Sequence, residues 1–276
     1  MNSEVRLAVL AVFVAVALGG CQEIPPRSGV YDVRVVPVTL SQISLPVTMV
    51  TPRSQRHEGL LILFATGDDG WFFTSRYLLQ HLAASGYTIA AFDSTLVTSA
   101  ADSWHARVQP DLAARSMDML LVQAKRELAL PADAPTVITG FSRGATFVVF
   151  AAGEPALQEH IVGGVALALT LQSDYLDPPS AVERPDWLQF DKDGRLLTYP
   201  AIARLGALPI AVIQAAGDSY VPAAESRRLF GPDTATRRLY EVNSRYHSFV
   251  FSLGETYRCL DEALDWVVST SNQRGR

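Results

Sequence analysis

The sequence predicts an α/β fold in which residues 30–276 form one domain, with a mostly parallel central sheet and flanking helices. Several short aliphatic runs are typical of strands buried on both faces of a sheet. Segments with helical periodicity separate these runs, and strands that alternate with helices form parallel sheets with right-handed crossovers. The chain has 276 residues, of which 49% are hydrophobic, so it can form one large core.

The elements follow in order along the chain. Residues 31–40 and 45–50 alternate between polar and apolar side chains, which predicts two edge strands in a hairpin. Further strands are predicted at residues 60–65, 87–93, 136–140, 161–170, 208–216 and 237–242. Helices are predicted at residues 75–84, 111–128, 145–153 and 255–268, and a further helix after the turn at Gly217.

Residues 172–207 interrupt this alternation. The segment is polar, rich in proline and too long for an ordinary connection. It carries Trp187, Phe190 and Tyr199, and it follows a strand at the sheet edge where open α/β sheets bind ligands. We interpret it as a small cap insertion over the site. A surface excursion without function is the alternative.

The N-terminus predicts an export signal. Residues 7–18 are an unbroken apolar run, shorter than the roughly 20 residues that a membrane-spanning helix needs. The sequence Leu-Gly-Gly-Cys that follows resembles the lipobox of bacterial lipoproteins, which predicts a signal peptide at residues 1–21 and lipidation of Cys21. An ordinary cleaved signal or an uncleaved anchor is the alternative. Residues 22–29 are a short linker, and the expected location is the periplasm, at a membrane.

Charge and cysteine content exclude some classes of protein. The net charge is −5 and no stripe of Lys and Arg stands out, so no nucleic-acid partner is expected. Besides Cys21 the chain has one cysteine, Cys259, which we expect to be buried in a helix. No cluster of His and Cys is present, so no metal or other cofactor is expected.

The sequence TGFSRGAT, residues 139–146, contains a candidate nucleophile. Gly-x-Ser-x-Gly alone is weak evidence, but here a predicted strand precedes Ser142 and a predicted helix follows it. This context is typical of a serine exposed on a sharp strand-to-helix turn. A serine hydroxyl is a poor nucleophile near pH 7, so it needs a base, and the base needs an acid that orients it.

Chain order selects the other two members of a catalytic triad, because in this architecture the acid and then the histidine follow the serine. Three histidines precede Ser142, and His160 begins a strand before any suitable acid. His247 follows the last predicted strand, and Asp218 lies just after the strand at residues 208–216. We therefore predict Ser142, Asp218 and His247 as catalytic residues. Asp233 is the competing acid, but it lies in a polar loop away from that strand end.

The oxyanion hole needs two backbone N–H groups. We expect one from Arg143, after the nucleophile, and one from Asp68 in the loop TGDDGW, with the amide of Asp69 as the second choice. In the same loop, Asp69 and Trp71 are expected to bind substrate. Carboxylates beside a site for an anion are unfavourable unless Arg143 offsets them or the substrate brings a cation. The remaining interpretation is that both aspartates are simply solvated.

Together, TGDDGW, FDS, GFSRGA, GDSYVP and the late YHSF resemble the VirJ/AcvB family of bacterial periplasmic proteins, over about residues 58–269. The family's usual motifs are Ser-Gly-Asp-Gly-Gly-Trp and Gly-Tyr-Ser-Phe-Gly-Ala, from which this chain departs at Thr66, Asp69, Phe141 and Arg143. The resemblance implies an α/β-hydrolase fold, export and a Ser-Asp-His site. It also implies hydrolysis of aminoacyl esters of phosphatidylglycerol, the lysyl lipid above all.

The expected function is therefore that of an exported serine hydrolase of esters. Its substrate would be a small-molecule or lipid ester, and aminoacyl phosphatidylglycerol would match the charges of Asp68 and Asp69. Two alternatives remain. One is a general carboxylesterase or lipase, and the other is a non-catalytic adaptor of virulence or secretion, since fold alone does not establish catalysis.

Overall fold

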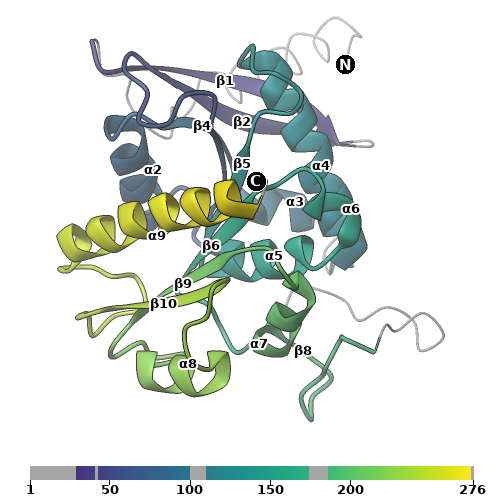
Figure 1. Cartoon of the computed structure of the whole chain (residues 1–276), viewed down its shortest axis with the longest axis vertical. Helices are drawn as coiled ribbons and strands as arrows, with labels where there is room; N and C mark the ends of the chain where they lie inside the picture. Colours follow the sequence, from purple (N-terminus) through teal and green to yellow (C-terminus); the bar gives the residue numbers. More distant parts are fainter. Residues whose placement is uncertain (1–28, 41–42, 100–109, 174–185, 275–276) are drawn as a thin grey trace, which may run out of the picture.

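The computed structural model describes residues 29–40, 43–99, 110–173 and 186–274 (Figure 1). Within these residues the main sheet has eight strands, in the spatial order β1-β2-β4-β3-β5-β6-β9-β10. Their bounds are β1 Tyr31–Leu40, β2 Ile43–Pro52, β3 Leu61–Ala65, β4 Thr88–Phe92, β5 Thr136–Phe141, β6 Gly163–Leu167, β9 Ile210–Ala215 and β10 Arg237–Val242.

The sheet is mostly parallel. β1 pairs with β2, and β2 with β4, in antiparallel orientation, so the predicted hairpin forms one edge. Every other neighbouring pair is parallel, from β4 to β10. Ala65 pairs with both Phe92 and Gly140, so β3, β4 and β5 end level with one another. The carboxyl ends of these strands therefore meet at one edge of the sheet, as the alternating pattern predicted.

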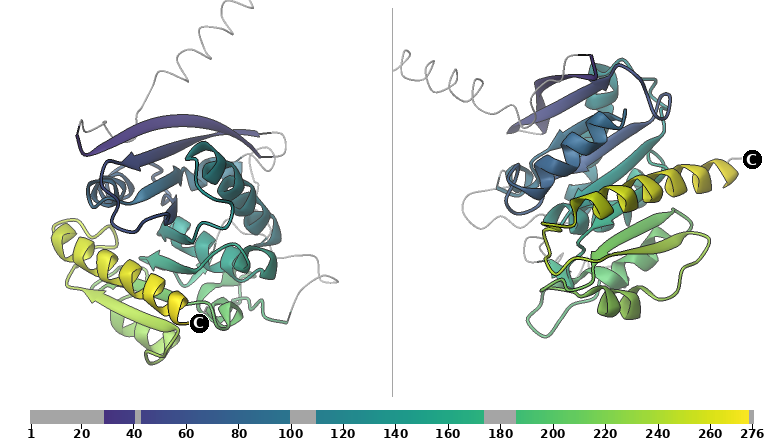
Figure 2. Two further views of the ribbon diagram at one scale, coloured as in Figure 1. Left: turned by 45° about the horizontal axis from the view of Figure 1, so that its top comes forward. Right: turned by 90° about the vertical axis from the view of Figure 1, so that its left-hand side faces the viewer.

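Helices cover both faces of the sheet because the inner strands are apolar on both sides. Leu61 and Leu63 of β3 pack into one core cluster, and Ile62 and Phe64 pack into the other. Two helices cover the second face, α2 Thr74–Ala84 and α9 Leu253–Arg274 (Figure 2). On the first face lie α4 Pro110–Glu127, α5 Arg143–Ala152, α6 Pro155–Gln158 and α8 Ala223–Phe230. The short helices α3 Ser94–Ser99 and α6 were not among the predicted elements.

The 172–207 insertion is described except for residues 174–185, which lie outside the described residues. It contains a two-stranded ladder, a short helix and a 3₁₀ turn: β7 Gln172–Ser173, β8 Leu196–Leu197, α7 Thr198–Ala201 and Ile202–Leu205. Trp187 packs beside Phe150 of α5, and the hydroxyl of buried Tyr199 donates to Ser226 Oγ at 2.8 Å. These two aromatic side chains therefore attach the insertion to the core.

The predicted signal peptide at residues 1–21, Cys21 and the linker up to residue 28 lie outside the described residues. In the described part of the chain, no helix is both long enough and apolar enough to cross a membrane. Cys259 lies in α9 and is buried, as predicted, and burial raises the pKa of its thiol.

Candidate active site

Ser142 lies on the turn between β5 and α5, in a backbone conformation with φ 54° and ψ −113°. Positive φ is costly for a residue with a side chain, so the surrounding contacts must hold it. The two glycines of the motif allow the turn. A Cβ at Gly140 would clash with the backbone of Gly144, and a Cβ at Gly144 would clash with the carbonyl oxygen of Ala65. The motif therefore packs the turn tightly against the end of β3.

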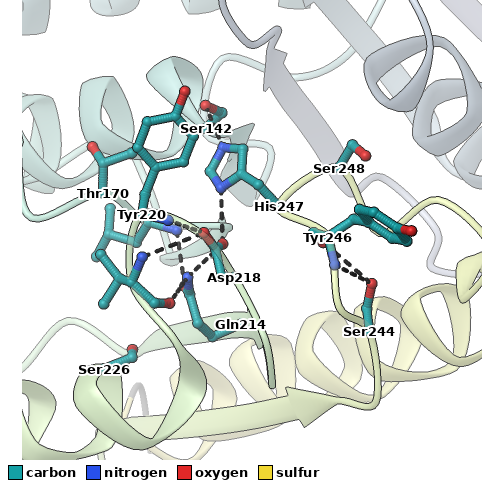
Figure 3. Close-up of polar contacts among 12 residues, drawn as sticks. Ser142, Thr170, Gln214, Asp218, Tyr220, Ser226, Ser244, Tyr246, His247 and Ser248 are labelled. Carbon is teal, nitrogen blue, oxygen red and sulfur yellow. Dashed lines mark hydrogen bonds and ion pairs between the residues drawn. The ribbon is translucent and has the colours of Figure 1, made fainter.

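Ser142, His247 and Asp218 form a continuous hydrogen-bonded chain (Figure 3). His247 Nε2 lies 2.8 Å from Ser142 Oγ, and His247 Nδ1 lies 2.8 Å from Asp218 Oδ2. An ionised carboxylate can only accept, so Nδ1 carries the proton and Nε2 is free to accept the serine proton. Each residue follows the end of a different parallel strand, β5, β9 or β10, which is why residues far apart in sequence meet here.

Asp218 is almost completely buried, and its carboxylate accepts four hydrogen bonds from its surroundings. Besides His247, the donors are Tyr220 N at 2.8 Å, Val221 N at 3.3 Å and Gln214 Nε2 at 2.9 Å. These donors compensate for the loss of water around the charge. Gln214 was not predicted as a site residue, although a glutamine within the apolar run LPIAVIQAA was a signal for it.

The loop that follows β3 is held by side chains from neighbouring elements. Gly67 N donates to Ser75 Oγ at 3.1 Å, Ser94 N donates to Thr66 Oγ1 at 3.1 Å, and Ser94 Oγ donates to the Thr66 carbonyl at 2.8 Å. Gly70 has φ 57°, and a Cβ there would meet the carboxylate of Asp93. Asp68, the predicted second oxyanion donor, therefore has a fixed backbone beside Ser142.

The two predicted oxyanion residues are joined through their side chains. Arg143 Nε donates to Asp68 Oδ1 in an ion pair, while the Arg143 amide begins α5 directly after Ser142. The ion pair offsets the charge of Asp68, which is the first of the two possibilities that the sequence left open for the carboxylates of this loop. Asp69 is exposed, and among the described residues its carboxylate has no ion-pair partner. Asp69 thus remains the uncompensated negative charge beside the site.

Ser142 lies between two cavities. The first, of about 430 Å³, is mainly apolar and includes aromatic side chains from the start of α2. It is lined by Asp68, Asp69, Phe72, Phe73, Thr74, Tyr77, Phe141, Ser142, Tyr220, His247, Ser248, Val250 and Leu253. The second, of about 300 Å³, is polar and is lined by Asp68, Ser142, Arg143, Thr170, Leu171, Gln172, Arg195 and Tyr220. An ester bound at Ser142 can place chemically different groups on its two sides.

Trp71 does not lie where the sequence analysis placed it. It is half-buried, packs against the core cluster under α2, and lines neither of these cavities. The next two residues, Phe72 and Phe73, line the first cavity instead. The chain reverses at Gly70, so Trp71 faces the core. From the insertion, Gln172 and Arg195 line the second cavity, whereas Trp187, Phe190 and Tyr199 pack against the core.

No family model and no curated protein matches this sequence. Among solved structures, it is similar to Est1E from Butyrivibrio proteoclasticus, with 14% identity over 85% of this chain and 99% of that one, and a TM-score of 0.60. An α/β serine hydrolase without a lid from Xanthomonas campestris has 14% identity over 88% and 97%, with a TM-score of 0.56. An arylesterase has 15% identity over 98% and 97%, with a TM-score of 0.54.

These similarities establish the α/β-hydrolase fold, as the sequence predicted. In this fold a nucleophile, an acid and a histidine are expected after the carboxyl ends of parallel strands, in that chain order. Ser142, Asp218 and His247 occupy these positions after β5, β9 and β10. In the described residues, no group of three or more His, Cys, Asp or Glu side chains is placed to bind a metal ion.

Proposed function

We propose that the protein is a serine hydrolase of carboxylic esters. The observation that carries this proposal is the chain of two 2.8 Å hydrogen bonds from Ser142 through His247 to Asp218. A non-catalytic adaptor has no need for this arrangement, or for a serine held at a positive φ beside two cavities. The described groups match the roles that acyl transfer requires: nucleophile, base, orienting acid and backbone donors.

The proposed reaction has two steps. His247 Nε2 accepts the proton of Ser142 as Oγ attacks the ester carbonyl, and Asp218 stabilises the imidazolium that forms. The amides of Arg143 and Asp68 hold the oxyanion, and one such donor contributes roughly 3 kcal/mol to transition-state stabilisation. The imidazolium then protonates the departing alcohol. Water, activated by His247 in the same way, cleaves the acyl-enzyme and releases the carboxylic acid.

A narrower proposal is that the acyl group carries a positive charge. Asp69 lines the first cavity, and no described residue forms an ion pair with it. An aminoacyl ester has an ammonium group beside the scissile carbonyl, and a lysyl ester has a second one, so Asp69 would favour such substrates. The resemblance to the VirJ/AcvB family supports lysyl-phosphatidylglycerol as the particular ester.

Export and lipidation of Cys21 are also proposals, and their support is the apolar run at residues 7–18 and the Leu-Gly-Gly-Cys sequence. Fractionation of cells that express the wild type and Cys21→Ser tests this directly. The modified wild type would stay with membranes and carry a lipid mass at Cys21. Recovery of both proteins in the same soluble fraction would refute the anchor.

The test of the proposed activity compares the wild type with Ser142→Ala on two substrates, vesicles that contain lysyl-phosphatidylglycerol and a short neutral ester. Release of lysine by the wild type only would support the narrower proposal. Hydrolysis of the neutral ester alone would leave a general esterase. If neither substrate is cleaved and a serine-directed probe does not label Ser142, the enzyme proposal is wrong and the adaptor interpretation is favoured.

A further inference from the structure

Exposed aromatic side chains surround the mouth of the first cavity. We call them the aromatic rim: Phe72 is 64% exposed, Phe73 59%, Tyr77 43%, Tyr220 64%, Tyr246 51% and Phe251 88%. The first four line the cavity itself, and the other two flank the segment 247–250, which contributes to its wall. Tyr220 and Tyr246 lie on opposite sides of His247 (Figure 3). Six large aromatic side chains exposed around one cavity indicate an interaction site, because large exposed apolar groups that gather in one place commonly mark binding surfaces.

The backbone holds two of these side chains outward at a cost. Phe73 has φ 42° and Phe251 has φ 70°, and both are bulky residues in a region that favours glycine. Such conformations cost of order 1–3 kcal/mol each, persist only where the surrounding structure holds them, and cluster at active and binding sites. The rim residues also pack in edge-to-face pairs, Phe72 with Phe73 at 4.3 Å and Tyr246 with Phe251 at 6.0 Å between ring centroids. The exposed rings thus keep a defined arrangement.

Two arginines belong to the same segments as the rim. Arg76 directly precedes Tyr77 in α2, and Arg245 directly precedes Tyr246. Both are exposed, and neither has an ion-pair partner among the residues that the structure describes. On the same side, Asp69 is the unpaired carboxylate. Among these three groups of the described residues the balance of unpaired charge is positive, which complements a surface that carries negative charge.

We propose that the aromatic rim docks on a lipid bilayer that contains anionic lipid, so that the first cavity opens into the membrane interface. Aromatic rings prefer the boundary between headgroups and acyl chains, and arginine side chains reach the phosphates from there. Because four rim residues also line the cavity beside Ser142, an ester with an apolar chain could pass from the bilayer to the triad without crossing water. Docking itself does not depend on the proposed hydrolase activity, whereas this delivery of substrate does.

The test places tryptophan on two faces of the full chain and measures fluorescence quenching by phosphatidylglycerol vesicles with brominated acyl chains. Phe251→Trp reports on the rim. Val122→Trp is the matched control, because Val122 is 47% exposed but lies on α4, on the opposite face of the sheet from α9. We expect quenching beyond that of the wild type for the variant at position 251, and no quenching beyond the wild type for the variant at position 122.

Both variants carry the same N-terminus, so any anchor acts on both equally. Equal quenching, or none at either position, would overturn the proposal and, if none occurs, would favour a protein partner.

The charge component has its own measurement. Arg76→Gln with Arg245→Gln, in the Phe251→Trp background, should raise the lipid concentration for half-maximal quenching by about 10- to 30-fold. For the Phe251→Trp protein with both arginines intact, vesicles of brominated phosphatidylcholine, which carry no net charge, should raise the same lipid concentration by a similar factor. If neither change has an effect, anionic lipid is not the occupant. Hydrolysis of a short soluble ester by the same proteins tests the activity separately, and it should be unchanged by the two arginine substitutions.

Discussion

Gln214 donates a hydrogen bond from Nε2 to Oδ2 of Asp218 at 2.9 Å. The same nitrogen donates to the carbonyl of Val221 at 2.7 Å, and Gln214 Oε1 accepts from Leu169 N at 3.0 Å. Gln214 is completely buried in β9. One side chain therefore connects the acid of the triad, the turn that follows it and the end of the neighbouring strand.

Gln214→Met keeps the approximate size of the side chain and removes all three hydrogen bonds. We expect kcat to fall roughly tenfold, because Asp218 would orient His247 less well. KM should change little, because Gln214 does not contact the substrate. Urea unfolding should show a loss of about 1–3 kcal/mol, since buried backbone groups lose their partners. A stability loss with unchanged kcat would mean that Gln214 has a structural role only.

Ser142 provides a test of backbone strain that is separate from catalysis. Ser142→Ala and Ser142→Gly both remove the hydroxyl and its bond to His247, but only glycine adopts φ 54° and ψ −113° without steric cost. We expect the glycine variant to be more stable by about 1 kcal/mol, after its larger loss of chain entropy is included. Thermal unfolding of the two proteins measures this. A less stable glycine variant would contradict strain at the turn.

Asp69→Asn tests charge selection at the first cavity. We expect kcat/KM for a lysyl ester to fall about tenfold, which corresponds to the loss of roughly 1.4 kcal/mol of attraction, while a neutral ester of similar size is hydrolysed as before. Asp233→Asn is the matched control, because Asp233 is the competing acid from the sequence analysis and is paired with Arg227 away from both cavities. Equal effects on charged and neutral esters would exclude selection by Asp69.

The surroundings of Asp265 in α9 predict how the stability of the protein depends on pH. Burial disfavours its charged form, but hydrogen bonds from Arg56 at 2.7 Å and from His57 at 2.8 Å outweigh this effect, so its pKa lies below the ordinary value of 3.8. Because the folded-state pKa is the lower one, the stabilisation is complete above pH 3.8 and is lost as the pH falls through the folded pKa.

Asp265→Asn should therefore be less stable than the wild type at pH 7, by at most about 1 kcal/mol because the pair is partly exposed. Below pH 3.8 the two proteins should converge. Urea midpoints at a series of pH values measure the difference. A difference in stability between the two proteins that stays constant down to acidic pH would show that the ion pair is not its cause.

Several features were predictable because they depend on local pattern and chain order. The aliphatic runs gave β3 to β6 and β9 without ambiguity, since a strand buried on both faces must be apolar throughout. The residues after those strands then meet at one edge, which brings Ser142, Asp218 and His247 together. Helix α3 was missed because it is only six residues long and lacks a clear periodicity.

Other features depend on contacts between distant segments. The pairing of Arg143 with Asp68 was one of several possibilities, because either aspartate could have met the arginine or the solvent. Trp71 and Phe72 are adjacent and both aromatic, yet one packs against the core and the other lines the cavity. That choice depends on the direction in which the chain leaves Gly70, where φ is 57°.

The amino-acid sequence by itself determined the parallel α/β architecture and the order of its candidate catalytic residues, because both follow from strand periodicity and from the turn that each strand requires. Tertiary structure decided the environment of those residues. The bond of Gln214 to Leu169 of the neighbouring strand end, the ion pair of Arg143 with Asp68 and the aromatic rim at the mouth of the first cavity arise between segments that are remote in the chain. Their geometry depends on how the sheet and helices pack, which no local pattern encodes.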